Sequence, residues 1–245
     1  MDNIYKKLLD NIDMYIIVTD LNNNIIYKNN NFAYELFCSK NNKLNEIEYK
    51  NKIFSIDYTE VDNYRIYSYN DITKYKSEIN KLKRDYLTNL YNRFAILEKL
   101  EELKDKKYAL IIGDIDYFKK INDNYGHLVG DYVLKGISDL LVKSINNKGI
   151  IGRYGGEEFI IIVPYMELNE AYNLIEKIRK LIKKTKIKVK YNDCIKEFYV
   201  SMTFGMTYNN LDKNIKELIS EADKALYQGK NNGRNQTNIY KKNED

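Results

Sequence analysis

The stretch Arg153-Tyr154-Gly155-Gly156-Glu157-Glu158-Phe159 decides the fold, and it lies between the apolar runs Ile150-Ile151 and Ile160-Ile161-Ile162-Val163. A Gly-Gly pair between β-rich runs is typical of a tight hairpin turn, because glycine reaches positive φ without steric cost. Two adjacent carboxylates on such a turn repel each other unless a cation or a proton lies between them. The stretch therefore predicts a β-hairpin at a sheet edge that carries a divalent-metal site.

A second group of acids lies upstream of the hairpin, directly after a strand of the buried type. The apolar run 108–113 leads into Asp114-Ile115-Asp116, and a short apolar run of this kind is typical of a buried strand. Mg2+ prefers one or two carboxylates together with substrate phosphate oxygens. Asp114 and Glu157, with or without Glu158, therefore predict a Mg2+ site. A single histidine and two cysteines exclude a His-rich metal site.

Further motifs accompany the hairpin in a fixed order. They are Asp85-Tyr86-Leu87-Thr88-Asn89-Leu90-Tyr91-Asn92-Arg93, residues 114–123, residues 126–131, and residues 222–227 followed by 230–235. With the hairpin they resemble the GGDEF family of diguanylate cyclases, and the resemblance covers residues 84 to 240. Five motifs in order make it specific.

The resemblance and the pattern of elements together give the expected fold. Strands and helices alternate, which predicts an α/β (α+β) sandwich with a central sheet. The family implies a ferredoxin-like palm over 84–242, similar to those of adenylyl cyclases and polymerases. Besides the hairpin, the expected elements are strands at 108–113, 187–191 and 198–208, and helices from Tyr117, over 131–145, over 167–184 and over 215–228.

The family also implies metal and catalytic roles. Asp114 would bind Mg2+, or Mn2+ in its place, through its carboxylate, and Ile115 through its carbonyl; the alternative for Asp114 is a solvated acid at a strand end. Glu157 would act as both metal ligand and general base, with Glu158 as a further ligand. Asp116 is as consistent with a helix N-cap as with the metal site.

Phosphate recognition is expected beside the same strand end. The backbone amides of Tyr117 and Phe118 would face an anion at a helix N-terminus, and Lys119 would add a positive charge for binding and catalysis. Lys230 and Arg234 resemble the family's contacts to the β- and γ-phosphates. Their alternative is a basic end of a helix, which the helix dipole favours.

Guanine selectivity is expected from Asn122 and Asp131. A carboxylate accepts hydrogen bonds from N1 and N2 of guanine, and an amide donates to O6, whereas adenine would leave Asp131 facing the wrong edge. His127 is expected only to shape the turn before Asp131. The segment Asn146-Asn147-Lys148-Gly149 occupies the place of the family's Arg-x-x-Asp inhibitory site, which predicts no product inhibition there.

The first 71 residues are expected to form a separate unit. Strands at 15–20 and 25–28 flank an Asn-rich turn, a helix follows over 31–37, and strands return at 52–58 and 64–69. Residues 4–73 resemble a PAS sensor domain, truncated in its central helices, with an Asp-Ile-Thr exit at 71–73. The alternative is a shrunken PAS-like fold that only dimerises.

A helical linker is expected over residues 72–87. Ile72, Tyr75, Ile79, Leu82 and Tyr86 recur at spacings of three and four, which predicts a coiled-coil seam of two heptads. An ordinary amphipathic helix is the alternative. A parallel stalk would place two catalytic domains relative to each other.

Composition agrees with these expectations. The chain of 245 residues has a net charge of +5 with lysines scattered among acids, which argues against a nucleic-acid surface. Cys38 and Cys194 are expected to be reduced thiols. Residues 1–10 lack the apolar core of a signal peptide and no run is long enough to span a membrane, so a cytoplasmic protein is expected.

The resemblance implies that two GTP molecules, one on each subunit of a homodimer, condense to cyclic di-GMP with loss of two pyrophosphates. Downstream receptors of the dinucleotide are not expected to bind the chain directly. Two alternatives stay open. One is a non-catalytic regulator that binds GTP or cyclic di-GMP, and the other is a cyclase that forms 3′,5′-cyclic GMP from one GTP.

Overall fold

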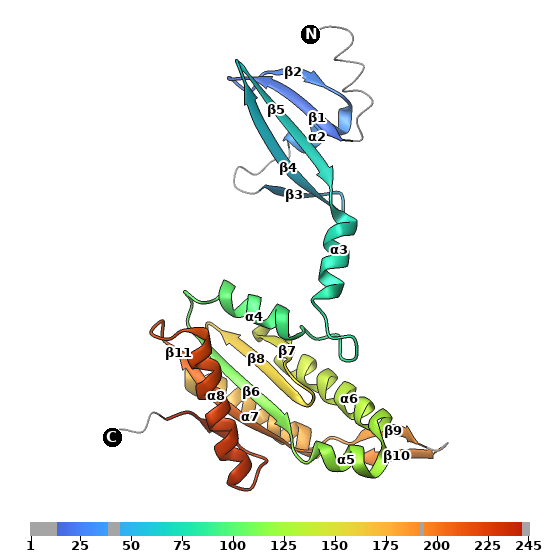
Figure 1. Ribbon diagram of the computed structural model, residues 1–245, viewed down its shortest axis with the longest axis vertical. Coiled ribbons are helices and arrows are strands. Elements are labelled where there is room, and N and C mark those ends of the chain that lie inside the picture. Colours follow the sequence, from blue (N-terminus) through green and yellow to red (C-terminus); the bar gives the residue numbers. More distant parts are fainter. Residues whose placement is uncertain (1–13, 39–44, 192–193, 242–245) are drawn as a thin grey trace. The chain divides into compact units, whose positions relative to one another are not determined.

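The computed structural model describes residues 14–38, 45–191 and 194–241, and the chain divides into two units, Met1–Leu82 and Lys83–Asp245 (Figure 1). Residues 1–10, for which no signal peptide was expected, lie outside the described residues, as does residue 242. No helix in the described part of the chain is long and apolar enough to cross a membrane.

The first unit is built on an antiparallel sheet with the strand order β2-β1-β5-β4-β3. Its elements are β1 (Tyr15–Asp20), β2 (Ile25–Lys28), α2 (Asn31–Cys38), β3 (Glu46–Tyr49), β4 (Lys52–Val61) and β5 (Tyr64–Asp71). Ala33 and Leu36 of α2 pack with Ile17, Phe54 and Tyr69 of the sheet, all fully buried. The strands at 15–20 and 25–28 and the helix from residue 31 are confirmed, whereas β3 was not predicted. The PAS resemblance of this unit stays a prediction.

The linker helix is shorter than predicted. Helix α3 (Thr73–Leu82) ends five residues before residue 87, so Tyr86 of the proposed seam is not helical. The carboxylate of Asp85 accepts hydrogen bonds from the N–H and hydroxyl of Thr88, at 2.9 and 2.7 Å. Such a side-chain turn competes with helix continuation. Helix α3 buries none of its side chains, and the coiled coil stays a prediction.

The second unit has the central sheet that was predicted, with the strand order β12-β11-β6-β8-β7. Strands β11, β6, β8 and β7 pair antiparallel, and β12 joins β11 in parallel. The order of elements and of strands is that of a ferredoxin-like fold. The elements are α4 (Arg93–Glu102), β6 (Tyr108–Ile115), α5 (Phe118–Tyr125), α6 (His127–Ile145), β7 (Ile150–Arg153), β8 (Glu158–Pro164), α7 (Leu168–Lys184), β9 (Ile187–Tyr191), β10 (Cys194–Phe198), β11 (Met202–Asn209), α8 (Ile215–Asn231) and β12 (Thr237–Ile239).

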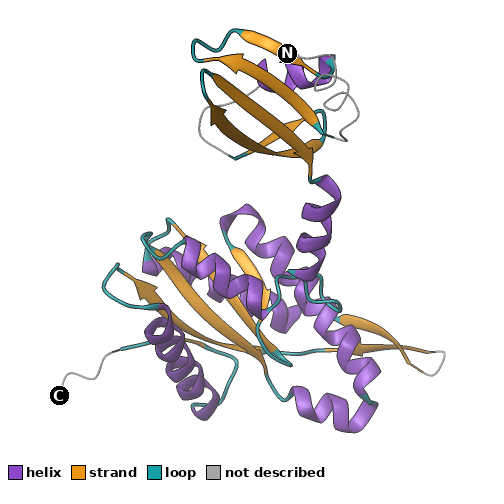
Figure 2. Ribbon diagram, turned by 45° about the horizontal axis from the view of Figure 1, so that its top comes forward, coloured by secondary structure: helices purple, strands orange, loops and turns teal. Residues whose placement is uncertain are grey.

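Helices cover both faces of this sheet (Figure 2). Leu110 and Ile112 of β6 pack with α4 and α8 on one face, whereas Ala109 and Ile111 pack with α6 and α7 on the other. Because side chains alternate along a strand, the whole of β6 is buried. Two predicted bounds were wrong: α6 begins at His127 rather than at residue 131, and the strand expected over 198–208 begins only at Met202.

Candidate active site

The two acidic motifs meet where β6 ends and the β7–β8 hairpin turns. Asp114 is paired in register with Glu158, and the N–H of Ile115 donates to the carbonyl of Glu157 at 3.3 Å. Paired residues of antiparallel strands point to the same face, so the carboxylates of Asp114 and Glu158 lie on the face that α8 covers. The predicted hairpin and its proximity to Asp114 are thus present.

The hairpin glycines were predicted to adopt positive φ, and this prediction was wrong. Among the described glycines, positive φ is found at Gly126 and Gly233, and not at Gly155 or Gly156. A Cβ on Gly155 would lie 2.6 Å from Oε2 of Glu158. The carboxylate of Glu158 therefore lies over Gly155, and a side chain at this position would displace the end of the Glu158 side chain, whereas the turn itself does not need a left-handed residue here.

A cavity of about 330 Å³ opens beside this strand end. It brings together eight of the eleven residues predicted for the site, from four separate parts of the chain. They are Asp114, Ile115, Tyr117, Phe118, Lys119, Glu157, Lys230 and Arg234. Three predicted residues, Asn122, Asp131 and Glu158, are not among those that line it.

Burial disfavours the ionised forms of the two cavity acids, Asp114 and Glu157. Asp114 is only 7% exposed, and burial raises the pKa of its carboxyl, although the Lys230 ammonium at 2.8 Å opposes that effect. Burial also raises the pKa of Glu157, and the negative charge of Asp114 raises it further. A divalent cation between the two carboxylates would reduce this electrostatic repulsion.

The donor set fits a hard cation. Within residues 14–38, 45–191 and 194–241, no cluster of three His, Cys, Asp or Glu side chains could hold a metal ion. Two carboxylates, a backbone carbonyl such as that of Ile115 and the phosphate oxygens of a substrate suit Mg2+, which seldom occupies an all-protein cage. Asp114 and Glu157 are thus the carboxylates that could hold it.

One side of the cavity is formed by the start of α5 and the end of α8. Tyr117 precedes α5 in the left-handed region, at φ 58°, and no side chain caps this helix end. Two cations contact the Tyr117 ring, with the guanidinium carbon of Arg234 at 4.5 Å and Nζ of Lys120 at 4.7 Å from its centroid. Uncapped N–H groups and fixed cations favour an anion here.

The two residues predicted to select guanine lie at the elbow between α5 and α6. Oδ1 of Asn122 is buried without a hydrogen-bond partner and lies against Gly130, where a Cβ would overlap it. Asp131 follows Gly130 in the sequence, so the elbow brings both residues into one neighbourhood. An unpaired buried polar atom is uncommon in a folded protein.

Asp116 is neither a helix cap nor a cavity residue, although both roles were considered for it. The N-cap of α5 is Tyr117, and Asp116 does not line the cavity. Its carboxylate accepts hydrogen bonds from Ser201, Thr203 and the backbone of Asn235 instead. The sequence held no sign of these partners, because they lie far along the chain.

Arg153 is a further residue whose role the sequence did not reveal. Its Nε and Nη2 donate to the carbonyl of Gly156 at 3.1 and 2.8 Å, and its Nη1 contacts both carboxylate oxygens of Asp85 at 3.2 and 3.3 Å. Both side chains are about 15% exposed. Arg153 therefore joins the turn that carries Glu157 to the segment after α3.

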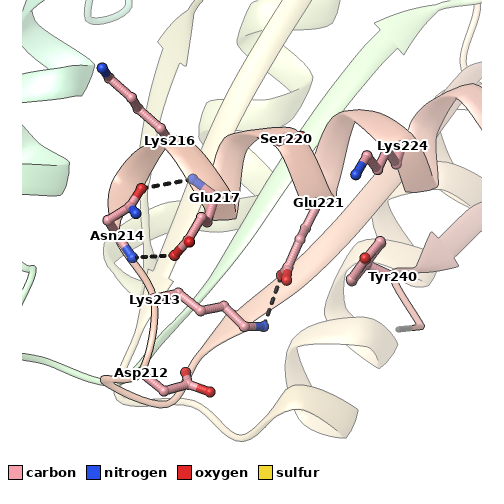
Figure 3. A pocket seen from close by; sticks show the side chains of 9 residues that line it. All are labelled: Asp212, Lys213, Asn214, Lys216, Glu217, Ser220, Glu221, Lys224 and Tyr240. Carbon is pink, nitrogen blue, oxygen red and sulfur yellow. Dashed lines mark hydrogen bonds and ion pairs between the residues drawn. The ribbon is translucent and has the colours of Figure 1, made fainter. Parts of the chain in front are cut away.

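A larger hollow of about 760 Å³ lies along the start of α8 (Figure 3). None of the predicted site residues lines it. Asn214 and Glu217 form a capping box there, each side chain bonded to the other's backbone N–H, and Lys213 pairs with Glu221 at 2.8 Å. These polar groups start and stabilise the helix, so the hollow is not a candidate active site.

The fold and the cavity define a palm-type α+β domain with acids and cations gathered at one end of its central strands. Residues 82–236 match the family described as "Diguanylate cyclase, GGDEF domain". The chain belongs to this family.

Individual relatives agree with the family assignment. The chain is 36% identical over 164 residues to "Diguanylate cyclase A" of Treponema denticola, a match that covers 66% of this chain and 43% of that protein. It spans about half or less of the length of the curated relatives that it matches.

Solved structures give the same result. The coiled coil and GGDEF domain of DgcB from Caulobacter crescentus, in complex with c-di-GMP, align with a TM-score of 0.63 and 25% identity over 68% of this chain and 90% of that one. The active GGEEF domain of a diguanylate cyclase from Vibrio cholerae aligns with a TM-score of 0.51 and 32% identity, covering 60% of this chain and 91% of that one.

Proposed function

We propose that this protein is a diguanylate cyclase that condenses two GTP molecules into cyclic di-3′,5′-GMP and two pyrophosphates, as a homodimer that uses Mg2+ or, in its place, Mn2+. One observation carries the proposal. A single cavity gathers Asp114, Glu157, the N-terminus of α5, Lys230 and Arg234, which are the groups that nucleotidyl transfer from a triphosphate needs.

Each group has a role that follows from its place. Lys230 and Arg234 bind the β- and γ-phosphates, and the amides of Tyr117 and Phe118 receive further phosphate oxygens. Lys119 adds positive charge as phosphate charge develops. Asp114, Glu157 and the carbonyl of Ile115 would hold the cation, which supplies charge neutralisation at the phosphates when bound.

Glu157 is proposed as the general base. Its raised pKa brings the carboxylate closer to the operating pH, which suits a group that accepts a proton from an attacking 3′-hydroxyl. Glu158 is proposed as a further ligand, and support for it comes from its pairing with Asp114 on the same face of the sheet.

Guanine is proposed to bind at the elbow of α5 and α6. The carboxamide of Asn122 lies against Gly130, and Asp131 follows Gly130 on the adjoining turn of α6, so the NH2 group of Asn122 could donate to O6 of guanine while the Asp131 carboxylate accepts from N1 and N2. Together they offer hydrogen-bonding groups to a purine edge, and a mismatched base would leave them unpaired.

A homodimer is proposed because the 3′-hydroxyl and the α-phosphorus that react belong to two GTP molecules, one on each subunit. Helix α3 and the PAS-like unit would set the placement of the two catalytic domains. We propose that the reaction occurs in the cytoplasm, where GTP is available. Direct binding of the receptors for cyclic di-GMP to this chain is not part of the proposal.

The test is to incubate the purified protein with GTP and Mg2+ and to resolve the nucleotides by chromatography and mass spectrometry, with Glu157→Gln in parallel. Cyclic di-GMP from the wild type and not from the variant supports the proposal. GTP that binds to a confirmed dimer without conversion supports a regulator instead, and 3′,5′-cyclic GMP supports an intramolecular cyclase.

A further inference from the structure

The carboxylate of Asp116 is the centre of a buried hydrogen-bond network behind the cavity. Asp116 is 5% exposed. Oδ1 accepts from the hydroxyl of Thr203 at 2.6 Å, and Oδ2 accepts from the hydroxyl of Ser201 at 2.6 Å and from the N–H of Asn235 at 3.0 Å. The same N–H of Asn235 also donates to Oγ1 of Thr203 at 2.9 Å, so Asp116 and Thr203 hold it together. Its own N–H donates to the carbonyl of Ser201 at 2.9 Å. Asp116 thus joins the end of β6, the start of β11 and the loop after α8.

The loop held in this way has a backbone that does not form readily by itself. Gly233, Arg234 and Asn235 are consecutive residues with φ of 101°, 62° and 47°. Left-handed conformations cost energy in residues other than glycine, so surrounding contacts must fix them. Asn235 receives two such contacts from Nη1 of Arg179, to its carbonyl at 2.9 Å and to its Oδ1 at 2.7 Å.

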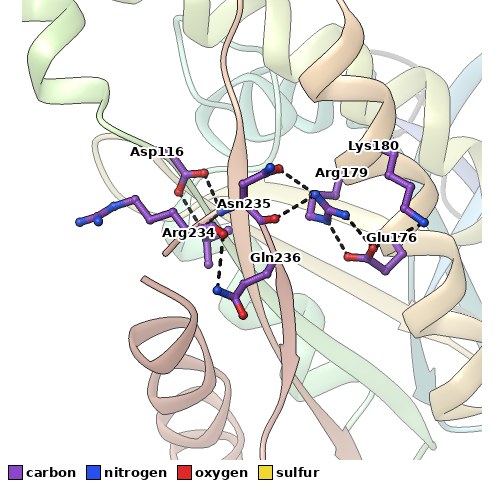
Figure 4. A network of polar contacts seen from close by, with 8 residues as sticks. Asp116, Glu176, Arg179, Lys180, Arg234, Asn235 and Gln236 are labelled. Atoms are coloured by element: carbon purple, nitrogen blue, oxygen red, sulfur yellow. Dashed lines mark hydrogen bonds and ion pairs between the residues drawn. The ribbon is translucent and has the colours of Figure 1, made fainter. Parts of the chain in front are cut away.

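The same loop carries Arg234 toward the cavity. Arg234 and Arg179 extend to opposite sides of the loop (Figure 4). The guanidinium of Arg234 stacks on Tyr117, the residue directly after Asp116. Two consecutive residues therefore position Arg234. Asp116 holds the backbone of Asn235, the residue after Arg234, and Tyr117 contacts the guanidinium of Arg234 itself.

We infer that Asp116 is a positioning residue that fixes Arg234 for the triphosphate of GTP, and that it is not a metal ligand. The inference rests on the proposed function for the identity of the ligand. Both carboxylate oxygens of Asp116 are already used by three donors, and Asp116 does not line the cavity that Asp114 lines. A ligand to a cation there would have to give up those donors and leave them buried and unpaired.

The test is a double-variant cycle on nucleotide binding. Affinity for 3′-deoxy-GTP, which lacks the attacking hydroxyl, is measured by calorimetry for wild type, Asp116→Ala, Arg234→Ala and the double variant. Loss of a charged hydrogen bond predicts binding that is weaker by about tenfold to a hundredfold for Arg234→Ala, and by about tenfold for Asp116→Ala. Because Asp116 acts through Arg234, the double variant should bind within about twofold of Arg234→Ala.

The Mg2+ concentration that gives half-maximal nucleotide binding shows whether Asp116 positions Arg234 or binds the cation. It should stay within about twofold of wild type in Asp116→Ala. A large shift in that concentration, or losses that add in the double variant, would overturn the inference. Thr203→Val keeps the shape of the side chain but removes a hydroxyl that donates to Asp116 and accepts from the N–H of Asn235, and it tests the network if Asp116→Ala does not fold. Ser138→Ala, which removes a buried hydroxyl bonded to Leu134, is the matched control and should bind as wild type does.

Amide exchange decides the inference independently of GTP. The N–H of Asn235 should exchange at least about tenfold faster in Asp116→Ala and in Thr203→Val than in wild type and Ser138→Ala. Unchanged exchange would overturn the inference. A wild type that binds no nucleotide would instead contradict the proposed function, and the exchange result would still show whether Asp116 holds the loop.

Discussion

Nζ of Lys230, near the end of α8, lies 2.8 Å from Oδ2 of Asp114, at the end of β6. The Asp114 side chain is 9% exposed and that of Lys230 is 30% exposed, so the pair is largely shielded from water. A residue proposed to bind phosphate is thus also the positive partner of a residue proposed to bind the cation. The proposed substrate and cation sites therefore share one ion pair.

This pair leads to a stability prediction. Lys230→Met should lower the free energy of unfolding by about 1–3 kcal/mol, because it leaves the buried carboxylate of Asp114 without its charged partner. Adding Asp114→Asn should recover much of the loss. Urea unfolding at neutral pH measures both, and strictly additive losses in the double variant would contradict the coupling.

Glu157→Gln should remove activity without loss of stability. Burial and the charge of Asp114 disfavour the ionised form of Glu157, so a neutral amide relieves that repulsion. Since the side chain is partly exposed and screened by water, we expect the melting temperature without Mg2+ to rise by no more than about 2 °C. A lower melting temperature than wild type would show that Glu157 stabilises the fold.

The link between Asp85 and Arg153 should depend on pH. Burial opposes the charge of Asp85, but hydrogen bonds from Thr88 and the Arg153 guanidinium outweigh burial and lower its pKa. A lowered pKa in the folded state stabilises the protein above the unfolded value of about 4, and that contribution is lost as the pH falls through the folded value. Asp85→Asn should therefore cost about 1–3 kcal/mol at pH 7.

Urea unfolding of wild type and Asp85→Asn at a series of pH values checks this prediction. The difference between the two proteins should shrink as the pH falls below about 4. Thr88→Val, which removes one donor and keeps Arg153, should show a smaller difference with the same trend. A difference that is constant with pH would mean that the charge of Asp85 has no part in it.

Asp131→Asn should weaken the preference for guanine. In the proposed site the carboxylate would accept from two donors of guanine, whereas an amide presents a mixed edge, so GTP binding should weaken by about tenfold to a hundredfold. ATP binding should change little. Competition between GTP and ATP for the protein measures the ratio, and Asp139→Asn, on an exposed position of the same helix, is the control.

Added cyclic di-GMP should not inhibit the enzyme through residues 146–149. The segment lacks the Arg and Asp of the family's inhibitory site, and the backbone disfavours restoring them. Asn146 has φ 49°, and a Cβ on Gly149 would lie 2.7 Å from the carbonyl of Ile162. Initial rates measured with increasing product check this, and inhibition that Lys148→Ala abolishes would contradict it.

Local patterns were enough to predict several parts of this protein. The apolar run before Asp114 and the Gly-Gly turn before Glu157 predicted a buried strand and a hairpin, and both are present. These signals succeed because strand period, apolar runs and turn residues act between neighbours in the chain. The motif order also predicted the family, and Lys230 and Arg234, which the resemblance placed at the site, line the same cavity as Asp114.

Other features depend on contacts that no local pattern encodes. Asp116 meets Ser201 and Asn235 across 85 and 119 residues of chain, and Arg153 meets Asp85 across 68. Which side chains lie opposite each other is set by strand order and register, and both emerge only when the sheet is complete. The sequence by itself therefore determined the buried strand β6, the hairpin after it and the family, and it identified the acids proposed for the site. Only the tertiary structure decided which of those acids face the cavity and which hold the fold behind it.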